Sequence, residues 1–509
     1  MSRYSKSVVA SGHPLVSEAA ATVLKEGGNA FDGVVAAGFA SCVVEPALNS
    51  LGGGGLLLGH SAARGQNLFF DFFVDTPGLG LANPVSEPHF FPVTIQFSGS
   101  SQDFNVGLGS VAVPGTLKGL LHTHRRLGFM DLADVLVPAI ELAKSHRLNE
   151  KQAYFLKLLH PIMTLLPEGR EIYASGGNYV QEGDLLVNHE LADFLGAVAH
   201  DHGESFYRGE IAEKIGRDMA ERDGLLTRDD LAAYEVKERK PLSVPFRDYE
   251  FITSPAPSMG GPLISLSLSL QSIGGAPDYE FGSPEYLTHT TGLMRKVEEI
   301  RANGFKTEAD LKEFLGDRSF AEQSVADIRL FSRGTTHISI ADKEGNCAAM
   351  TCSNGEGAGY FAPDSGVMLN NMMGEDDLHP EGFHSSPPGQ RVASMMSPSL
   401  LAKDNTVCLV IGSGGSKRIR TAVSQVLAQV IDFKRSLQEA VDAPRLHWDG
   451  SCVQMEPGFP AEGVLQLQQK VAVNEWGGLG VYFGGVHAVI PGREGAADPR
   501  RGGKALELE

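Results

Sequence analysis

Apolar and polar residues of this 509-residue chain follow the two periods that are typical of strands and helices. Side chains of residues 336–340 alternate in character with a period of two, which is typical of a half-buried strand. Residues 342–346 (DKEGN) have the composition of a turn, and residues 347–352 form a second apolar run. Together these segments predict a hairpin in the second half of the chain.

Other segments show the helical period. In residues 13–25 the apolar positions fall on one face, and Gly27 and Gly28 end the pattern. Residues 29–44 are rich in alanine, glycine and valine, which predicts a buried, closely packed helix. Further helices are predicted at residues 116–127, 132–146, 191–200, 211–221, 229–234, 263–273, 283–330, 416–431, 436–441 and 465–473.

Short apolar runs predict the strands. They lie at residues 8–10, 56–58, 68–74, 242–253, 367–369, 399–402, 407–412, 481–483 and 486–490. Residues 79–105 and 374–391 are predicted to be irregular loops, and residues 504–509 are excluded from the predicted fold. We find no repeat and no linker that separates independent domains. Strand pairs that alternate with runs of helices indicate an α/β (α+β) protein, with stacked sheets and helical layers outside.

Composition and charge exclude several classes of function. Hydrophobic content of 42% and charged content of 21% are those of an ordinary globular protein. The net charge of −19, without a basic block, argues against nucleic acid or an anionic membrane as a partner. Five cysteines without CxxC spacing indicate neither a zinc site nor a disulfide framework. We expect no metal and no cofactor. Without an apolar leader or a long apolar run, we expect a cytoplasmic protein.

Gly334 and Thr335 stand at the head of the predicted hairpin. If the backbone is cut between them, Thr335 carries both a nucleophilic hydroxyl and a free α-amine that can serve as its base. His337 is an alternative base, although its position is typical of a strand residue that supports the site.

Two glycine-rich segments are candidates for binding. Residues 413–416 (SGGS) precede a predicted helix, where unpaired amides can hold an anion or an oxyanion. Residues 52–55 permit close backbone approach and favour a loop that lines a cavity. They match neither GxGxxG nor a P-loop, so the spacing disfavours the alternative of a nucleotide-binding enzyme.

Eight separated segments give a more specific indication. In their order along the chain, residues 8–492 resemble the γ-glutamyltranspeptidase family of N-terminal nucleophile hydrolases. The segments are residues 24–32 (LKEGGNAFD), 51–55 (LGGGG), 113–116 (VPGT), 229–234 (DDLAAY), 335–337 (TTH), 369–371 (LNN), 396–398 (MSP) and 443–445 (APR).

The resemblance implies a four-layer αββα sandwich and a precursor that cuts itself between Gly334 and Thr335. The large subunit would comprise residues 1–334 and the small subunit residues 335–509, which together form one intertwined heterodimeric domain. Higher assembly is left open.

The resemblance also implies the chemistry. Thr335 attacks an amide carbonyl, and the acyl-enzyme is discharged by water or by an acceptor amine. The family's oxyanion glycines fall on Gly414 and Gly415, or one residue later on Gly415 and Ser416. Ser353 corresponds to a second hydroxyl residue near the nucleophile.

Substrate contacts are implied by further positions. The asparagine that orients the substrate falls on Asn354 if a short deletion precedes Gly355. The acid that holds the substrate amine falls on Glu375, or with a shift on Asp376 or Asp377.

The chain departs from the family where the substrate carboxylate is bound. Phe73 replaces the arginine that pairs with this carboxylate in γ-glutamyl enzymes, and a pair of serines becomes Ser394 and Met395. Replacement cations are Arg391, Lys417 and Arg418. We therefore expect a γ-glutamyl or similar small carboxylated amide as substrate, with weak activity on glutathione. The alternative is a non-catalytic, unprocessed relative that binds an amide or an amino acid.

Overall fold

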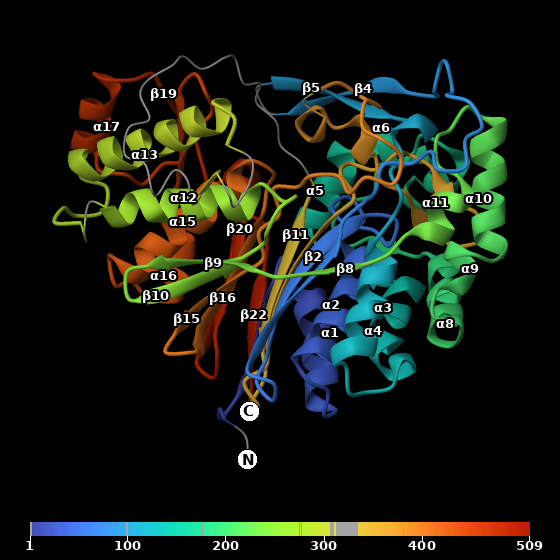
Figure 1. Cartoon of the computed structure of the whole chain (residues 1–509), viewed down its shortest axis with the longest axis horizontal. Coiled ribbons are helices and arrows are strands. Elements are labelled where there is room, and N and C mark those ends of the chain that lie inside the picture. Colours follow the sequence, from blue (N-terminus) through green and yellow to red (C-terminus); the bar gives the residue numbers. More distant parts are fainter. Residues whose placement is uncertain are drawn as a thin grey trace.

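The computed structural model describes residues 3–97, 100–174, 177–273, 275, 277–305, 310–311, 334–379 and 381–509. Two antiparallel sheets lie face to face, with helices on both outer sides (Figure 1). This is a four-layer αββα sandwich, so the predicted fold class is confirmed.

The first sheet has seven strands in the order β22-β1-β11-β12-β2-β3-β8. Its centre is the predicted hairpin, in which Thr336 pairs with Cys352 and Ala341 with Cys347. The strands are β1 (Ser7–Ser11), β2 (Gly54–Ser61), β3 (Gln66–Phe72), β8 (Lys237–Arg239), β11 (Thr336–Ala341), β12 (Cys347–Ser353) and β22 (Lys504–Leu508).

The second sheet has six strands in the order β21-β20-β16-β15-β10-β9. Small and branched apolar side chains of both sheets, such as Ala10, Leu58, Leu400 and Val410, fill the space between them. The strands are β9 (Leu242–Phe246), β10 (Tyr249–Thr253), β15 (Ser399–Lys403), β16 (Thr406–Gly414), β20 (Gly485–Ile490) and β21 (Glu494–Ala497).

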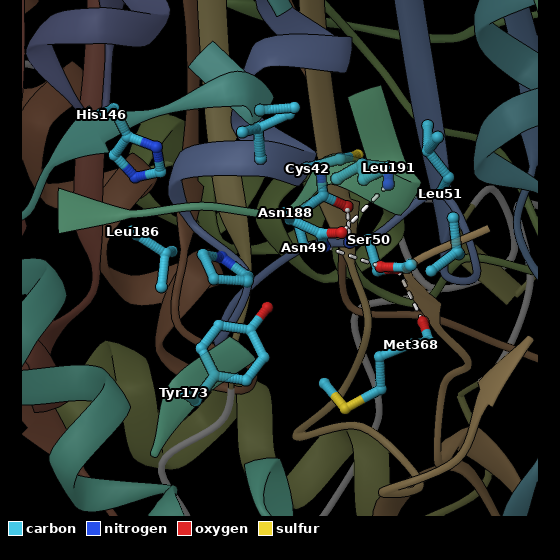
Figure 2. Close-up of a pocket in the computed structure, with 15 residues that line it drawn as sticks. Cys42, Asn49, Ser50, Leu51, His146, Tyr173, Leu186, Asn188, Leu191 and Met368 are labelled. Atoms are coloured by element: carbon cyan, nitrogen blue, oxygen red, sulfur yellow. Dashed lines mark hydrogen bonds between the residues drawn. The ribbon is translucent and has the colours of Figure 1, made fainter. Parts of the chain in front are cut away.

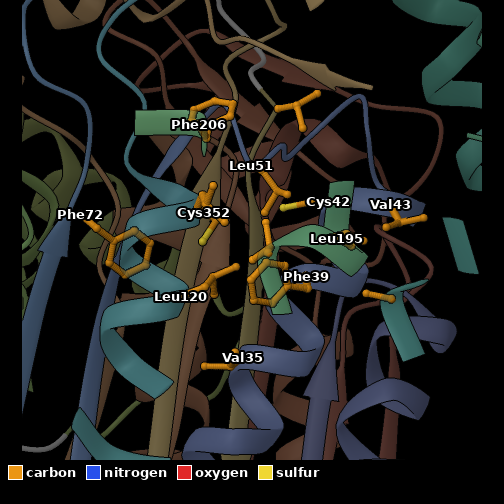
Figure 3. Packing of buried hydrophobic residues seen from close by; sticks show 14 of the residues in the cluster. Val35, Phe39, Cys42, Val43, Leu51, Phe72, Leu120, Leu195, Phe206 and Cys352 are labelled. Carbon is orange, nitrogen blue, oxygen red and sulfur yellow. The ribbon is translucent and has the colours of Figure 1, made fainter. Parts of the chain in front are cut away.

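Helices cover the outer face of the first sheet. The central one is α2, whose side chains are all buried and whose start is fixed by a capping box between Asn29 and Asp32. Figure 3 shows Val35 and Phe39 of this helix beside Leu120 in the same cluster. These helices are α1 (Pro14–Lys25), α2 (Ala30–Val44), α3 (Thr116–Leu127) and α4 (Leu132–Lys144).

The second sheet is covered by α12 (Gly260–Ile273), α15 (Arg418–Ile431) and α16 (Leu437–Asp442), and α13 (Pro284–Ala302) packs on α12. The other helices surround this frame: α5 (Glu150–Leu158), α6 (His160–Met163), α7 (Pro167–Tyr173), α8 (His189–Asp201), α9 (Glu204–Tyr207), α10 (Glu210–Glu221), α11 (Arg228–Ala233) and α17 (Ala461–Gln468). Most helices therefore lie where the periodicity predicted them.

Small sheets complete the structure. They are formed by β4 (Phe91–Phe97) with β5 (Ser100–Val106), β6 (His146–Arg147) with β7 (Leu185–Leu186), β13 (Phe361–Ala362) with β14 (Val367–Met368), and β17 (Leu446–Trp448), β18 (Val453–Met455) and β19 (Val473–Glu475).

Several local predictions were wrong. Residues 79–105 are not all irregular, because Ile95 and Phe104 are buried and hold the β4–β5 hairpin against the helices. The single strand predicted at residues 242–253 is a hairpin, since Arg247 takes a left-handed conformation between β9 and β10.

Three further differences lie near the C-terminus. The helix predicted at residues 465–473 is displaced to α17, and residues 481–483 form a 3₁₀ turn instead of a strand. Residues 504–508, which the prediction excluded, form β22 and pair with the whole of β1. Of the helix predicted at residues 283–330, α13 is observed, and residues 306–309 and 312–333 lie outside the described residues.

Candidate active site

Thr335 immediately precedes β11, at the edge where the two sheets and the end of α2 meet. It is 5% exposed. The strand alternation places Ile338 and Ile340 in the cluster beneath α2 and turns His337 toward Gly412 of the second sheet. The predicted nucleophile therefore lies in a buried and closely packed position.

The carbonyl group of Gly334 is the centre of the site. Its oxygen accepts hydrogen bonds from Thr335 Oγ1 at 2.8 Å and from Ser353 Oγ at 2.5 Å. The backbone N–H of Gly355 donates to Ser353 Oγ at 3.0 Å, which fixes the direction of that hydroxyl. The structure thus brings Ser353 to the Gly334–Thr335 pair, which the sequence had singled out separately.

Gly334 fits a space that no other residue can occupy without movement. A Cβ atom at this position would lie 2.5 Å from the carbonyl oxygen of Gly355 and 2.9 Å from that of Ala47. Contacts below 3.0 Å are repulsive, so backbone on two sides holds the Gly334–Thr335 peptide in place.

The predicted oxyanion glycines lie on the other side of Thr335. A Cβ atom on Gly414 would lie 2.2 Å from the carbonyl oxygen of Thr335, so Gly414 is in direct contact with the nucleophile residue. Gly415 has φ of +119° and Ser416 has φ of +52°, and together they turn the chain into α15. Gly414 belongs to the first of the two registers that the resemblance left open, and the choice between Gly414 with Gly415 and Gly415 with Ser416 remains a prediction.

Asn354 and Glu375 flank Gly355. Asn354 is 1% exposed, and its side-chain amide has no hydrogen-bond partner among the described residues. Glu375 Oε1 lies 2.5 Å from the place where a Cβ atom of Gly355 would be. Of the three candidate acids, Glu375 is the buried one, whereas Asp376 is exposed and Asp377 pairs with Lys417 at 2.7 Å.

Phe73 is buried in the cluster between the sheets. It lies against the glycine run, since a Cβ atom of Gly54 would be 3.0 Å from both Cα and Cδ2 of Phe73. Its carbonyl oxygen accepts hydrogen bonds from the Tyr234 hydroxyl at 2.6 Å and from Arg391. Phe73 is therefore an apolar side chain packed between the sheets, and its predicted place beside the substrate remains a prediction.

Ser394 and Met395 are not brought to Thr335 by any contact that we find in the described residues. The Ser394 carbonyl oxygen accepts hydrogen bonds from the Met259 backbone N–H at 2.7 Å and from Ser258 Oγ at 3.1 Å. Ser394 Oγ accepts from the Met396 backbone N–H at 3.0 Å. Their contacts are those of a structural turn before β15, and their predicted role in substrate binding remains a prediction.

The three cations that were expected to replace the missing arginine are all engaged. Arg391 lies 3.0 Å from Asp75 and donates to the Tyr234 hydroxyl at 2.7 Å. Lys417 is paired with Asp377, and Arg418 donates to the Tyr482 carbonyl oxygen at 2.9 Å. Each therefore has a structural partner of its own.

His337 is a supporting residue, as its position in the strand predicted. Its Nδ1 lies 2.7 Å from Thr351 Oγ1 and its Nε2 lies 3.0 Å from Ser339 Oγ. Burial, together with the neighbouring His487, lowers its pKa well below 6.5. A neutral ring with both nitrogens engaged is unsuited to act as the general base.

The glycine run serves close packing. A Cβ atom on Gly53 would lie 2.3 Å from the Ser353 carbonyl oxygen, so this run brings the start of β2 against the end of β12. Figure 2 shows a small cavity under the preceding turn, lined by Ser50 and Leu51 and faced by Tyr173. The four glycines are not among the residues that line this cavity, and the prediction that residues 52–55 line a cavity remains a prediction.

Sequence reasoning missed one buried acid near the nucleophile. Glu45 follows α2, is 7% exposed and accepts a hydrogen bond from Thr336 Oγ1 at 2.9 Å. The only signal that the sequence offered was an acid directly after the apolar second half of this helix.

No group of three or more metal-ligating side chains is found in the part of the chain that the structure describes. None of the described helices is long and apolar enough to cross a membrane.

Known proteins are similar to this one over nearly the whole chain. The profile of the gamma-glutamyltranspeptidase family matches residues 16–508. The glutathione hydrolase proenzyme of Escherichia coli is 31% identical, over 98% of this chain and 91% of that protein. The acylase ACY 1 proenzyme of a Pseudomonas species is also 31% identical, over 91% of this chain and 86% of that protein.

A solved structure supports the fold. Cephalosporin acylase from Bacillus halodurans superposes with a TM-score of 0.83 at 24% identity, over 99% of this chain and 96% of that one. The family match and the two relatives at 31% identity extend over nearly the whole chain. The chain belongs to the γ-glutamyltranspeptidase family and is a self-processing amidohydrolase of that family.

Proposed function

We propose that the chain cuts itself between Gly334 and Thr335 and that Thr335 then transfers the acyl group of a small amide to water or to an amine. The observation that carries this proposal is the Gly334 carbonyl, whose oxygen accepts from Thr335 Oγ1 at 2.8 Å and from Ser353 Oγ at 2.5 Å. These contacts hold the Thr335 hydroxyl beside the carbonyl group that it would attack, with a second donor, Ser353, at the carbonyl oxygen.

Self-cleavage follows from this arrangement. Thr335 Oγ bonds to the carbonyl carbon of Gly334, the C–N bond to Thr335 breaks, and the hydroxyl proton passes to the departing nitrogen. Ser353 donates to the carbonyl oxygen while negative charge develops there. Water then hydrolyses the ester, which leaves a carboxylate on Gly334 and a free hydroxyl and α-amine on Thr335.

The same atoms then turn over substrate. The α-amine of Thr335 takes the proton from Oγ as this atom attacks the amide carbonyl of the substrate. Gly414, in contact with Thr335, and Gly415 are the proposed donors to the oxyanion. The amine of the leaving group receives the proton, and water or an acceptor amine releases the acyl group from Oγ.

The substrate is proposed to be a γ-glutamyl or similar small carboxylated amide. Asn354 supports this, because its buried amide has no partner among the described residues and faces the same segment as Glu375. Phe73 and the engaged side chains of Arg391 and Lys417 support weak binding of an α-carboxylate, and hence weak activity on glutathione.

The two products of cleavage are proposed to remain one heterodimer, residues 1–334 and 335–509. Both sheets are built from strands of both parts: β11 and β12 lie between β1 and β2, and β15 lies beside β10. Separation would break both ladders and both cores.

A cytoplasmic location is also proposed. Its support is that all five cysteines are unpaired, which suits a reducing compartment, and cell fractionation tests it.

The wild-type chain, Thr335→Ala and Thr335→Ser provide the test of function. We expect two bands from the wild type on a denaturing gel, one band from Thr335→Ala, and partial cleavage of Thr335→Ser. The processed protein is then assayed on a panel of amides that includes glutathione. An unprocessed wild type that binds amino acids without turnover would favour the non-catalytic alternative instead.

A further inference from the structure

Glu45 contacts β11, the strand that follows Thr335, through Thr336. The helix α2 ends at Val44, and Glu45 is its C-terminal capping residue, 7% exposed. Its Oε2 accepts a hydrogen bond at 2.9 Å from the hydroxyl of Thr336, the residue that follows the nucleophile. The Thr336 side chain thus points to Glu45, whereas the backbone carbonyl of Thr335 contacts Gly414.

This is an unfavourable place for a carboxylate. The C-terminal end of a helix carries partial negative charge, and burial removes the carboxylate from water. Burial raises the pKa of Glu45 to about 7, although the hydrogen bond from Thr336 and the charge of Arg501 act in the opposite direction. A buried acid in a costly position beside a nucleophile is a candidate for a functional role.

The residues around Glu45 and Thr336 leave room for the hydrogen bond between them. A Cβ atom on Gly12 would lie 2.9 Å from Glu45 Oε1 and 3.2 Å from Thr336 Oγ1, so glycine at position 12 leaves room for the hydrogen bond. Arg501 and Glu45 line one small cavity, and Arg501 Nη2 is 3.5 Å from the Cβ position of Gly415. A contiguous set of residues therefore connects the back of the nucleophile strand with the turn that carries the proposed oxyanion donors.

Other ionisable groups face the same region. His13 and Lys151 line the cavity, and His487 Nε2 lies 3.4 Å from the Cβ position of Gly12. Burial raises the pKa of the Cys42 and Cys352 thiols, and the nearby charge of Glu45 acts in the same direction. Burial lowers the pKa of both His13 and His487 to about 4, so these rings are neutral in the pH range in which Glu45 titrates.

We propose that Glu45 is a positioning residue for self-cleavage, which in its ionised form holds Thr336 and so fixes the Thr335 hydroxyl against the Gly334 carbonyl. This inference rests on the proposed cleavage between Gly334 and Thr335. Its consequence is that the rate of self-cleavage depends on the charge of Glu45.

Self-cleavage is the right reaction to measure, because the α-amine of Thr335 does not exist before the bond is cut. The pH dependence of substrate turnover contains the titration of that amine, whereas the pH dependence of self-cleavage does not. Gln at position 45 keeps a hydrogen-bond acceptor and removes the charge. The ratio of the wild-type rate of self-cleavage to the Glu45→Gln rate therefore reports the effect of the Glu45 charge, since every other pH effect is common to both proteins.

The experiment uses full-length precursor made by cell-free translation, with the fraction cleaved followed on gels from pH 5 to pH 9. We expect the wild type and Glu45→Gln to cleave at equal rates at pH 5 and the wild type to be about tenfold faster at pH 9, with a midpoint near the pKa of about 7. A ratio that stays constant over this range would overturn the proposal.

Thr336 provides a second test. Thr336→Val removes the hydroxyl with little change of shape and should slow cleavage about tenfold at pH 9, whereas Thr336→Ser should stay within threefold of the wild type. The matched control is Thr94→Val, which removes a 2.6 Å hydrogen bond to Asp103 on the exposed β4–β5 hairpin. Equal rates for Thr336→Val and the wild type would contradict the inference.

Two readouts separate this inference from the proposed function. Thermal unfolding of each precursor, carried in the non-cleaving Thr335→Ala background, identifies variants that are merely misfolded. If Thr335→Ala itself cleaves between residues 334 and 335, the proposed function fails. If Thr335→Ala is inert and the pH ratio for Glu45→Gln is flat, only the role of Glu45 fails.

Discussion

Replacing Gly414 with alanine is the perturbation for which the structure gives the clearest magnitude. The new Cβ atom would lie 2.2 Å from the carbonyl oxygen and 3.0 Å from the carbonyl carbon of Thr335. Ordinary contact begins at 3.4 Å, so Thr335 or the end of β16 has to move by about 1.2 Å. The atoms on the other side are backbone, because Gly334 is held between Gly355 and Ala47.

A displacement of this size is large for a nucleophile. Misplacement by about 1 Å is associated with a loss of about 100-fold in rate, which corresponds to about 2.7 kcal/mol in the activation barrier. We therefore expect Gly414→Ala to lower both the rate of self-cleavage and the kcat of any processed enzyme by about 100-fold. The effect on KM should be smaller, since Gly414 lies against the nucleophile residue and not against Asn354.

The assay compares Gly414→Ala with Gly478→Ala, a position where an added Cβ atom meets nothing within 4 Å. Self-cleavage is followed on gels, and turnover is measured on the fraction that has been processed, after thermal unfolding has confirmed that each variant is folded. A Gly414→Ala protein that processes and turns over within threefold of the control would refute the reasoning, because the contact with Thr335 would then have no consequence.

Three further predictions concern the site and the core. Ser353→Ala should slow self-cleavage at least 100-fold, because it removes a hydrogen-bond donor to the Gly334 carbonyl, whereas Ser353→Thr keeps a donor and should retain most of the rate. Gels measure both rates, and equal rates for the two variants would contradict the mechanism. Asn354→Ala should raise the KM of the processed enzyme about tenfold in steady-state assays and leave self-cleavage unchanged. An unchanged KM for every amide tested would show that Asn354 is not part of the binding site. Although burial acts in the opposite direction, Arg445 and Arg500 hold the pKa of Asp498 at about 2, below its usual 3.8, so its contribution to stability is present above pH 4 and is lost as the pH falls toward 2. Urea unfolding from pH 5 to pH 2 should therefore show a steeper loss for the wild type than for Asp498→Asn, and parallel curves would contradict this assignment.

The β11–β12 hairpin could be predicted because its information is local. Alternation of side chains over residues 336–340 and a turn at residues 342–346 specify two paired strands whatever surrounds them. The placement of Ser353 beside Gly334 follows directly, since both lie at the same end of that hairpin.

Pairings between distant segments could not be predicted in this way. The strand β22 pairs with β1, nearly 500 residues away, and only the two-sheet arrangement makes a place for it. Glu45 depends on Gly12, Thr336 and Arg501, which come from three parts of the chain and meet only in the folded state. The turn at Arg247 did have a local signal that the prediction missed, because the consecutive polar residues Arg247 and Asp248 interrupt the alternation between Phe246 and Tyr249.

Intact-mass spectrometry of the purified wild-type protein tests the central claim most directly. The account predicts two polypeptides, of which the smaller begins at Thr335 and contains the 175 residues from 335 to 509, and a single polypeptide for Thr335→Ala. A single wild-type species of 54.4 kDa that nevertheless hydrolyses amides, or a small subunit that begins at any residue other than Thr335, would contradict it.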